Sequence, residues 1–342
     1  MRRGAVIAVS VLLTLTVVAA VVAWLRLQDP LAALPRDAPG AVRLIEERRE
    51  LWEGRMLLHV VLRGAAVGDV RLVVSLPDPI PPEPLPLIVV LGGLDGGTRS
   101  IRRISEVIGD PGPNAFLAYD WPLPPEEPSL LEIALHLLQL RRNVLSVPGQ
   151  VDALLAWATR QPWADPDRVS LLGFSLGAFV APAAQRVSQA RGSAVQWTII
   201  AYGGAPIGAV IAAHPAVKPA WIGGLLGAGA DLLLRPVEPG EHLPHLRGRF
   251  LVLRAGRDRL IAPAAADRLS ELTPEPRTVV VIEGDHMGLG PGKKKLLEKV
   301  VTISRAWMIE QGAIRPARPA RPASTPVEGR TLDRGAGVTS PR

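Results

Sequence analysis

The sequence predicts an α/β fold built on a doubly wound, mostly parallel sheet. Short, continuously apolar runs recur along the chain, as they do in strands that are buried on both faces. Helical patterns separate these runs, which favours right-handed crossovers between parallel strands. Hydrophobic residues make up 48% of the 342 residues, and aromatic residues only 4%. One large domain with a core of Ala, Val, Leu and Ile is therefore expected, with appendages at its ends.

The first 27 residues are predicted to target the chain to a membrane. An uncharged run over residues 4–25 follows Arg2 and Arg3 and ends before Arg26. At 1.5 Å per residue, such a run spans the hydrocarbon layer of roughly 30 Å. Its length favours a transmembrane signal anchor with a cytoplasmic N-terminus over a cleaved signal peptide. The main domain would then be extracytoplasmic at the inner or cytoplasmic membrane, and periplasmic or secreted if the segment is cleaved.

Residues 28–50 are interpreted as a linker, and residues 51–311 as the main domain. The domain opens with two apolar stretches that are typical of an antiparallel strand pair. The predicted strands are 56–62, 70–76, 87–91, 115–119, 169–172, 195–201, 250–253 and 279–282. Helices are predicted over 101–108, 130–159 (one or two helices), 263–272 and 293–310, and a further helix is predicted after the strand 169–172.

Two further segments differ in composition from the rest. Residues 203–248, rich in Gly, Ala and Leu, are interpreted as a cap over the site or as helices that cover the sheet. Residues 312–342 are rich in Pro and Arg and are predicted to be disordered. The net charge of +7 comes from dispersed arginines, so no nucleic-acid partner is expected. With no cysteine, the chain has neither disulfides nor a thiolate metal site.

A Gly-x-Ser-x-Gly motif lies where one apolar run ends and another begins. Gly173 and Gly177 flank Ser175 between the runs 169–172 and 178–184. This pattern predicts a nucleophile elbow, a tight strand-to-helix turn that presents the serine hydroxyl in a cleft. Alternatively, the motif is a tight turn without chemistry.

A serine nucleophile needs a base and a carboxylate that orients the base. His286 follows the last predicted strand, so we expect it at the carboxyl edge of the sheet. Asp258 follows the strand 250–253 and is the predicted carboxylate, although it could merely cap the next helix. Asp285 is a poorer candidate because neighbouring side chains on an extended loop diverge. The order Ser, Asp, His along the chain is the one expected with this elbow.

An oxyanion hole needs two backbone N–H donors. Leu176, directly after the serine, is expected to supply one. The other is expected from the glycine-rich segment 92–97, with Leu94 as first choice and Gly93 as second. The same segment has the glycine spacing of a phosphate-binding loop, but it lacks the Lys and Ser/Thr that should follow.

These motifs resemble those of the α/β-hydrolase superfamily, in particular the branch of dienelactone hydrolases and prolyl-oligopeptidase-like esterases. Residues 165–177 are similar to that family's passage from an Asp-x-x-Arg through an apolar run to the elbow. Residues 256–258 and 284–286 are similar to its acid and histidine loops. The resemblance covers residues 51–311. It implies hydrolysis of an ester, thioester or amide through an acyl-serine, with neither a metal nor an organic cofactor.

The sequence therefore predicts a serine hydrolase that cleaves carboxylic esters, with Ser175, Asp258 and His286 as its triad. Its expected substrate is a small-molecule or lipid-like ester. Two alternatives stay open. One is a catalytically silent protein of the same fold, tethered to the membrane as a binding or scaffold module. The other is peptidase or acyltransferase chemistry at the same site.

Overall fold

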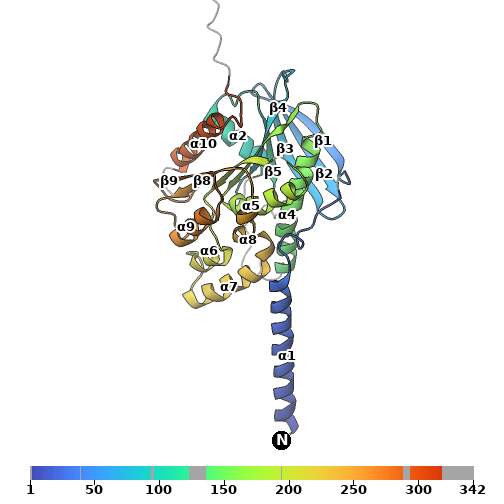
Figure 1. The fold of residues 1–342 in the computed structure, drawn as a ribbon, viewed down its shortest axis with the longest axis vertical. Coiled ribbons are helices and arrows are strands. Elements are labelled where there is room, and N and C mark those ends of the chain that lie inside the picture. Colours follow the sequence, from blue (N-terminus) through green and yellow to red (C-terminus); the bar gives the residue numbers. More distant parts are fainter. Residues whose placement is uncertain are drawn as a thin grey trace, which may run out of the picture.

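The computed structural model describes residues 2–38, 40–93, 96–122, 136–193, 195–287 and 293–317. Within these ranges, nine strands form one sheet in the order β1-β2-β3-β5-β4-β6-β7-β8-β9 (Figure 1). Their bounds are β1 (Arg43–Trp52), β2 (Arg55–Gly64), β3 (Gly68–Pro77), β4 (Leu85–Leu91), β5 (Ala115–Asp120), β6 (Ala164–Phe174), β7 (Val195–Ala201), β8 (Arg249–Ala255) and β9 (Arg277–Ile282).

The sheet is mixed, and its parallel part carries the predicted site. Strands β1, β2 and β3 form an antiparallel meander, and β3 pairs antiparallel with β5. From β5 through β4, β6, β7 and β8 to β9, all neighbours are parallel. The predicted α/β fold is confirmed, and the antiparallel flank adds to its mostly parallel sheet. All the carboxyl ends of the parallel strands meet at one edge, where ligands bind in such sheets.

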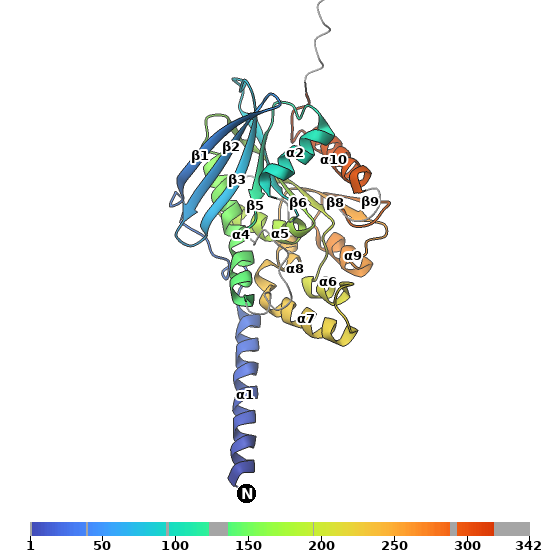
Figure 2. The ribbon, with the colours of Figure 1, turned by 180° about the vertical axis from the view of Figure 1, so that it is seen from behind.

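Helices cover both faces of the sheet (Figure 2). Along β4, Leu87 and Val89 belong to the core under α4 and α5, whereas Ile88 and Val90 belong to the core under α2 and α10. The helices are α1 (Arg2–Leu27), α2 (Gly97–Ile108), α4 (Leu137–Ala158), α5 (Leu176–Ala190), α6 (Ile207–Ala213), α7 (Ala220–Leu233), α8 (Pro239–His242), α9 (Pro263–Leu272) and α10 (Lys293–Glu310). The first part of the predicted helical segment 130–159 lies outside the described residues.

The linker assignment of residues 28–50 is wrong for its second half. Residues from Arg43 onward form β1, so the domain begins before residue 51. The strand was missed because it lies at the edge of the sheet and is exposed along most of its length. Its charged sequence lacks the apolar run of a buried strand, and such charges discourage edge-to-edge pairing with other chains.

The boundary drawn at residue 312 is also too early. Ala313 and Ile314 are buried in the core under α2 and α10. Arg315 continues this docking, because its N–H donates to Asn114 Oδ1 (2.9 Å) and its carbonyl accepts from Asn114 Nδ2 (2.8 Å). Two apolar residues in a Pro- and Arg-rich context gave too weak a signal to assign to a core. The predicted disorder concerns mainly residues 318–342, which lie outside the described residues.

The N-terminal helix α1 extends away from the domain (Figure 1). Over the part of the chain that the structure describes, no helix has the length and apolar character that a membrane crossing requires. The transmembrane assignment of residues 1–27 therefore stays a prediction.

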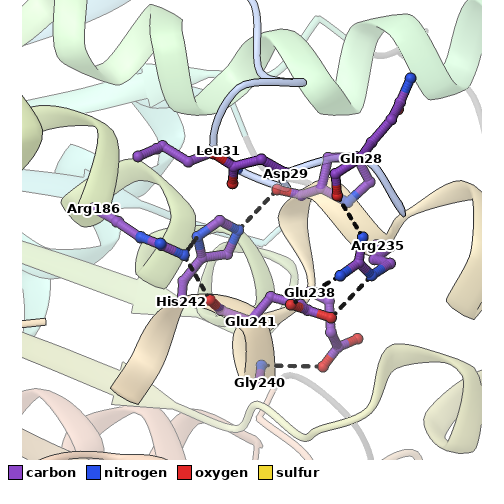
Figure 3. A network of polar contacts seen from close by, with 10 residues as sticks. Gln28, Asp29, Leu31, Arg186, Arg235, Glu238, Gly240, Glu241 and His242 are labelled. Carbon is purple, nitrogen blue, oxygen red and sulfur yellow. Dashed lines mark hydrogen bonds and ion pairs between the residues drawn. The ribbon is translucent and has the colours of Figure 1, made fainter. Parts of the chain in front are cut away.

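Segment 203–248 holds α6, α7 and α8, and a polar network ties it to the end of α1 and to α5 (Figure 3). Arg235 donates to the carbonyl of Gln28 (2.7 Å) and pairs with Glu241 (3.0 Å). Arg186, on α5, donates to the carbonyl of Glu241 (2.7 Å). The interpretation of 203–248 as a cap stays a prediction, but the network shows that the segment is firmly attached to the domain.

His242 is fully buried in this network. Its Nε2 donates to the carbonyl of Pro236 (2.8 Å), and Arg186 lies 3.5 Å from its Nδ1. Burial, reinforced by the charge of Arg186, lowers the pKa of His242 to about 4. The imidazole is therefore neutral in the fold at pH values where it is protonated in the unfolded chain.

This shift predicts that His242 reduces stability in acid. A folded-state pKa below the unfolded value of 6.5 means that unfolding takes up a proton, so the free energy of unfolding falls as the pH drops from 6.5 towards 4. Urea unfolding at pH 7.5 and at pH 4.5 measures this effect. Between these two values, the free energy of unfolding should fall by on the order of 2 kcal/mol more in the wild type than in His242→Gln. Burial also raises the pKa of Glu238, to about 7, but this group is present in both proteins. Parallel pH profiles would contradict a neutral buried imidazole.

Candidate active site

Ser175 lies in the tight turn between β6 and α5, as the motif predicts. Its backbone has φ 52° and ψ −114°, a conformation that residues with a side chain rarely adopt. Such a conformation costs about 1–3 kcal/mol and persists only where the surroundings enforce it. Here the N–H of Ser175 donates to the carbonyl of Ala201 at the end of β7 (2.9 Å). The turn therefore holds the serine at the carboxyl edge of the sheet.

The two glycines of the motif allow the close packing that enforces this turn. A Cβ on Gly177 would lie 2.0 Å from the carbonyl oxygen of Leu91 on β4. A Cβ on Gly173 would lie 2.6 Å from the carbonyl oxygen of Gly177 and 2.8 Å from the side chain of Ala181. These are contacts that no larger residue can make without moving the backbone. The glycine spacing is thus a packing requirement of the strand-to-helix turn.

The structure brings Ser175, His286 and Asp258 into one hydrogen-bonded chain. Ser175 Oγ lies 2.8 Å from His286 Nε2, and His286 Nδ1 lies 2.9 Å from Asp258 Oδ2. Because a carboxylate only accepts, Nδ1 carries the proton in the neutral ring and Nε2 is free to accept from the serine hydroxyl. The side chains of His286 and Asp258 are only 4% and 7% exposed. Three residues separated by up to 111 positions therefore meet in a largely dry site.

Backbone and side-chain contacts fix the two loops that carry the acid and the histidine. Asp258 Oδ1 accepts from the N–H groups of Leu260 (2.8 Å) and Ile261 (2.9 Å), which leaves Oδ2 for the histidine. Asp285 does not touch the imidazole. It accepts from the backbone N–H of His286 (2.7 Å) and pairs with the guanidinium of Arg259. These bonds lower the pKa of Asp285, and the bond from the His286 N–H has the largest effect. The charged carboxylate of Asp285 therefore ties the two loops together.

Two of the predicted oxyanion donors lie beside the serine. Leu176 is the first residue of α5, so its N–H has no acceptor within the helix. Gly93 approaches from the loop after β4, where a Cβ would lie 4.0 Å from the Cβ of Ser175. Leu94, the first choice for the second donor, lies outside the described residues. Gly93 therefore lies close to Ser175, and its role as the second donor stays a prediction.

The end of β5 contacts both ends of the segment 92–97, the predicted oxyanion loop. Asp120 accepts from the backbone N–H of Gly97, the first residue of α2. Trp121 Nε1 donates to the carbonyl of Gly92 (3.2 Å). A carboxylate thus occupies the helix N-terminus where a phosphate would sit in a phosphate-binding loop. This arrangement disfavours the phosphate alternative.

Tyr202 is a site residue that the sequence reading missed. It follows β7 with φ 62°, and its ring meets the imidazole of His286 edge to face, with centroids 5.5 Å apart. The residue is 1% exposed, and burial, with the charge of Asp258, raises the pKa of its hydroxyl. Among the described residues, the hydroxyl has no hydrogen-bond partner. The available signal was its position, since it follows a strand that lies between those leading to Ser175 and Asp258.

Comparison with solved structures places the fold among esterases. An acetyl xylan esterase from Thermoanaerobacterium sp. JW/SL YS485 is 12% identical with a TM-score of 0.53, over 80% of this chain and 91% of that one. For an acetyl xylan esterase from Paenibacillus sp. R4 the values are 16%, 0.53, 77% and 87%. For carboxyl esterase 2 from Tuber melanosporum they are 17%, 0.51, 75% and 89%. No protein-family model and no curated protein matches the sequence.

At sequence identities this low, the structural likeness shows a common fold and nothing beyond it. The chain has the α/β-hydrolase fold that these esterases share, as the motifs predicted. The narrower resemblance to dienelactone hydrolases and prolyl-oligopeptidase-like esterases stays a prediction.

The strained turn makes a prediction about stability. Ser175→Gly and Ser175→Ala both remove the hydrogen bond to His286, but only glycine tolerates φ 52° without strain. Ser175→Gly should therefore have a free energy of unfolding about 1 kcal/mol above that of Ser175→Ala. Urea unfolding of the two variants checks this. An alanine variant as stable as the glycine variant would show that the turn carries no strain.

Proposed function

We propose that this protein is a serine hydrolase that cleaves carboxylic esters through an acyl-serine. The single observation that carries the proposal is the chain from Ser175 Oγ through His286 to Asp258 Oδ2, at 2.8 and 2.9 Å. A turn with a purely structural role needs neither a buried imidazole beside the serine nor a buried carboxylate behind that imidazole. Esterases of the same fold support the choice of ester among the acyl substrates.

In the first half of the reaction, Ser175 Oγ attacks the ester carbonyl carbon while its proton passes to His286 Nε2. Asp258 holds the ring in the tautomer that can accept this proton and stabilises the imidazolium that forms. The negative oxygen of the tetrahedral intermediate accepts from the N–H of Leu176 and from the oxyanion loop, through Gly93 or Leu94. The intermediate collapses when the C–O bond to the alcohol breaks, and the alcohol leaves with the proton from His286.

In the second half, water takes the place of the alcohol. His286 Nε2 accepts a proton from the water as its oxygen attacks the acyl carbon, and the same donors stabilise the second oxyanion. Collapse returns the proton to Ser175 Oγ and releases the acid. The orienting bonds to Asp258 are the same in both halves, so one set of contacts serves both steps.

We also propose that α1 anchors this hydrolase in a membrane, with the catalytic domain outside the cytoplasm. The run 4–25 carries no charge, and Arg2 and Arg3 precede it. Leu12, Leu13 and Leu15 are each more than 60% exposed, and the helix extends away from the domain (Figure 1). An apolar helix whose side chains are this exposed needs another apolar partner, and acyl chains provide one.

The catalytic proposal predicts the loss of two readouts together. Ser175→Ala should abolish covalent labelling by a fluorophosphonate probe and lower kcat for p-nitrophenyl butyrate by about 10⁴-fold or more, because triad members act as a unit. Asp258→Asn should also lower kcat by about 10⁴-fold, since it favours the wrong imidazole tautomer. The control is Ser193→Ala, which lies before β7 at the opposite edge of the sheet and should keep both readouts. Labelling that survives in Ser175→Ala would refute the nucleophile. A folded wild type without labelling or turnover would favour the silent binding protein.

The anchor proposal predicts where the full chain partitions. Wild type should remain in the membrane pellet after a carbonate wash. The double substitution Leu13→Arg with Val17→Arg should move the protein to the supernatant, because each arginine costs about 2.5–3.5 kcal/mol at the centre of a spanning helix. The matched control, Leu13→Ala with Val17→Ala, should stay in the pellet. A wild type found in the supernatant would contradict the anchor.

A further inference from the structure

A cavity of about 710 Å³ is lined in part by Asp120 and Trp121, which hydrogen-bond to Gly97 and Gly92. It is bounded by the turn between β2 and β3, by the residues after β5 and by the first half of α4. Trp121 lines it, and the same indole donates to the carbonyl of Gly92, one residue before Gly93. Cavities of this volume hold small organic ligands. Trp121 thus connects the cavity to the strand end that carries Gly93, the residue that approaches Ser175.

Five charged side chains line this cavity, and the two carboxylates are already engaged in the fold. The five are Asp69, Arg71, Asp120, Arg141 and Arg142. Asp69 accepts from Arg63 at 2.6 and 3.0 Å, and this bond, helped by the charges of Arg63 and Arg71, lowers the pKa of Asp69. Asp120 accepts from the N-terminus of α2. Both negative charges are therefore compensated by fixed partners.

Among the residues that the structure describes, the three arginines keep N–H donors without a hydrogen-bond partner. Arg141 Nε donates to the carbonyl of Leu233 (2.9 Å), and one amino group of Arg142 donates to the side-chain oxygen of Gln139 (2.8 Å). Within the described ranges, none of the three forms an ion pair with a carboxylate. By contrast, the neutral amides that line the cavity already have acceptors, because Asn143 Nδ2 and Gln150 Nε2 donate to backbone carbonyls. The described residues that line the cavity thus present surplus positive charge, on planar groups that suit carboxylates.

We propose that this cavity binds a carboxylate carried by the substrate, an inference that rests on the proposed ester hydrolysis. The enzyme would then prefer esters with a carboxylate remote from the scissile bond over neutral esters of the same size. Arg71 and Arg142 are exposed, so each should contribute a modest factor, roughly two- to fivefold. The preference should shrink between about 0.05 and 1 M salt, because exposed charges are screened over a few Å at the higher concentration.

The test compares esters that differ only in one charge. In the acyl arm, p-nitrophenyl monoesters of glutaric, adipic and suberic acid are each compared with the corresponding p-nitrophenyl methyl diester. In the alcohol arm, 4-(butyryloxy)phenylacetic acid is compared with the same butyrate ester whose carboxyl group is methylated. The ratio of kcat/KM, acid over neutral, should exceed about tenfold in one arm at low salt, and that arm identifies the side of the substrate that the cavity binds.

Variants connect the preference to the cavity. Arg71→Gln and Arg142→Gln should each lower the acid-to-neutral ratio, and the double variant should lower it by roughly tenfold. Arg48→Gln is the matched control, because it removes the same charge from exposed β1 and should leave the ratio unchanged. Ratios near one in both arms, or equal losses in Arg48→Gln, would overturn the inference while ester hydrolysis stands. A wild type that turns over neither member of any pair would overturn both.

Discussion

The site depends on the hydrogen bond between Ser175 and His286, which exists only because neighbouring parallel strands end at the same edge of the sheet. β6, β7, β8 and β9 lie side by side, and each is followed by a residue of the site. These residues are Ser175, Tyr202, Asp258 and His286. Their separation in the chain is irrelevant once the strands are in register, since the spacing of strands fixes the spacing of the loops. The oxyanion loop approaches from the other side, after β4.

The loops are stabilised by contacts that do not take part in the reaction. Asp285 and Arg259 tie the histidine loop to the acid loop. Asp120 and Trp121 hold the oxyanion loop. These residues form a second layer around the reacting groups, and Tyr202 covers the imidazole ring. Such support explains how a serine keeps a strained backbone, because the energy of many ordinary contacts offsets the cost of one unfavourable turn.

The sequence predicted what depends on local pattern. Buried parallel strands appear as apolar runs, so β4 and β6 to β8 were recognisable, and the elbow motif located Ser175. The order of the strands also placed Asp258 and His286. What could not be predicted depends on tertiary context. β1 is a charged edge strand without an apolar run, and Ala313 and Ile314 become core only because α2 and α10 leave space for them. The contacts of Tyr202 and Asp120 arise from elements that are distant in sequence.

The most direct measurement of the central claim is the mass of the acyl-enzyme. The protein is mixed with p-nitrophenyl butyrate, quenched in acid within the first turnover and digested. The account predicts that the peptide containing Ser175 carries one butyryl group, in an amount that matches the initial burst of p-nitrophenol. A burst with the butyryl group on another residue, or turnover without any acylated peptide, would contradict it.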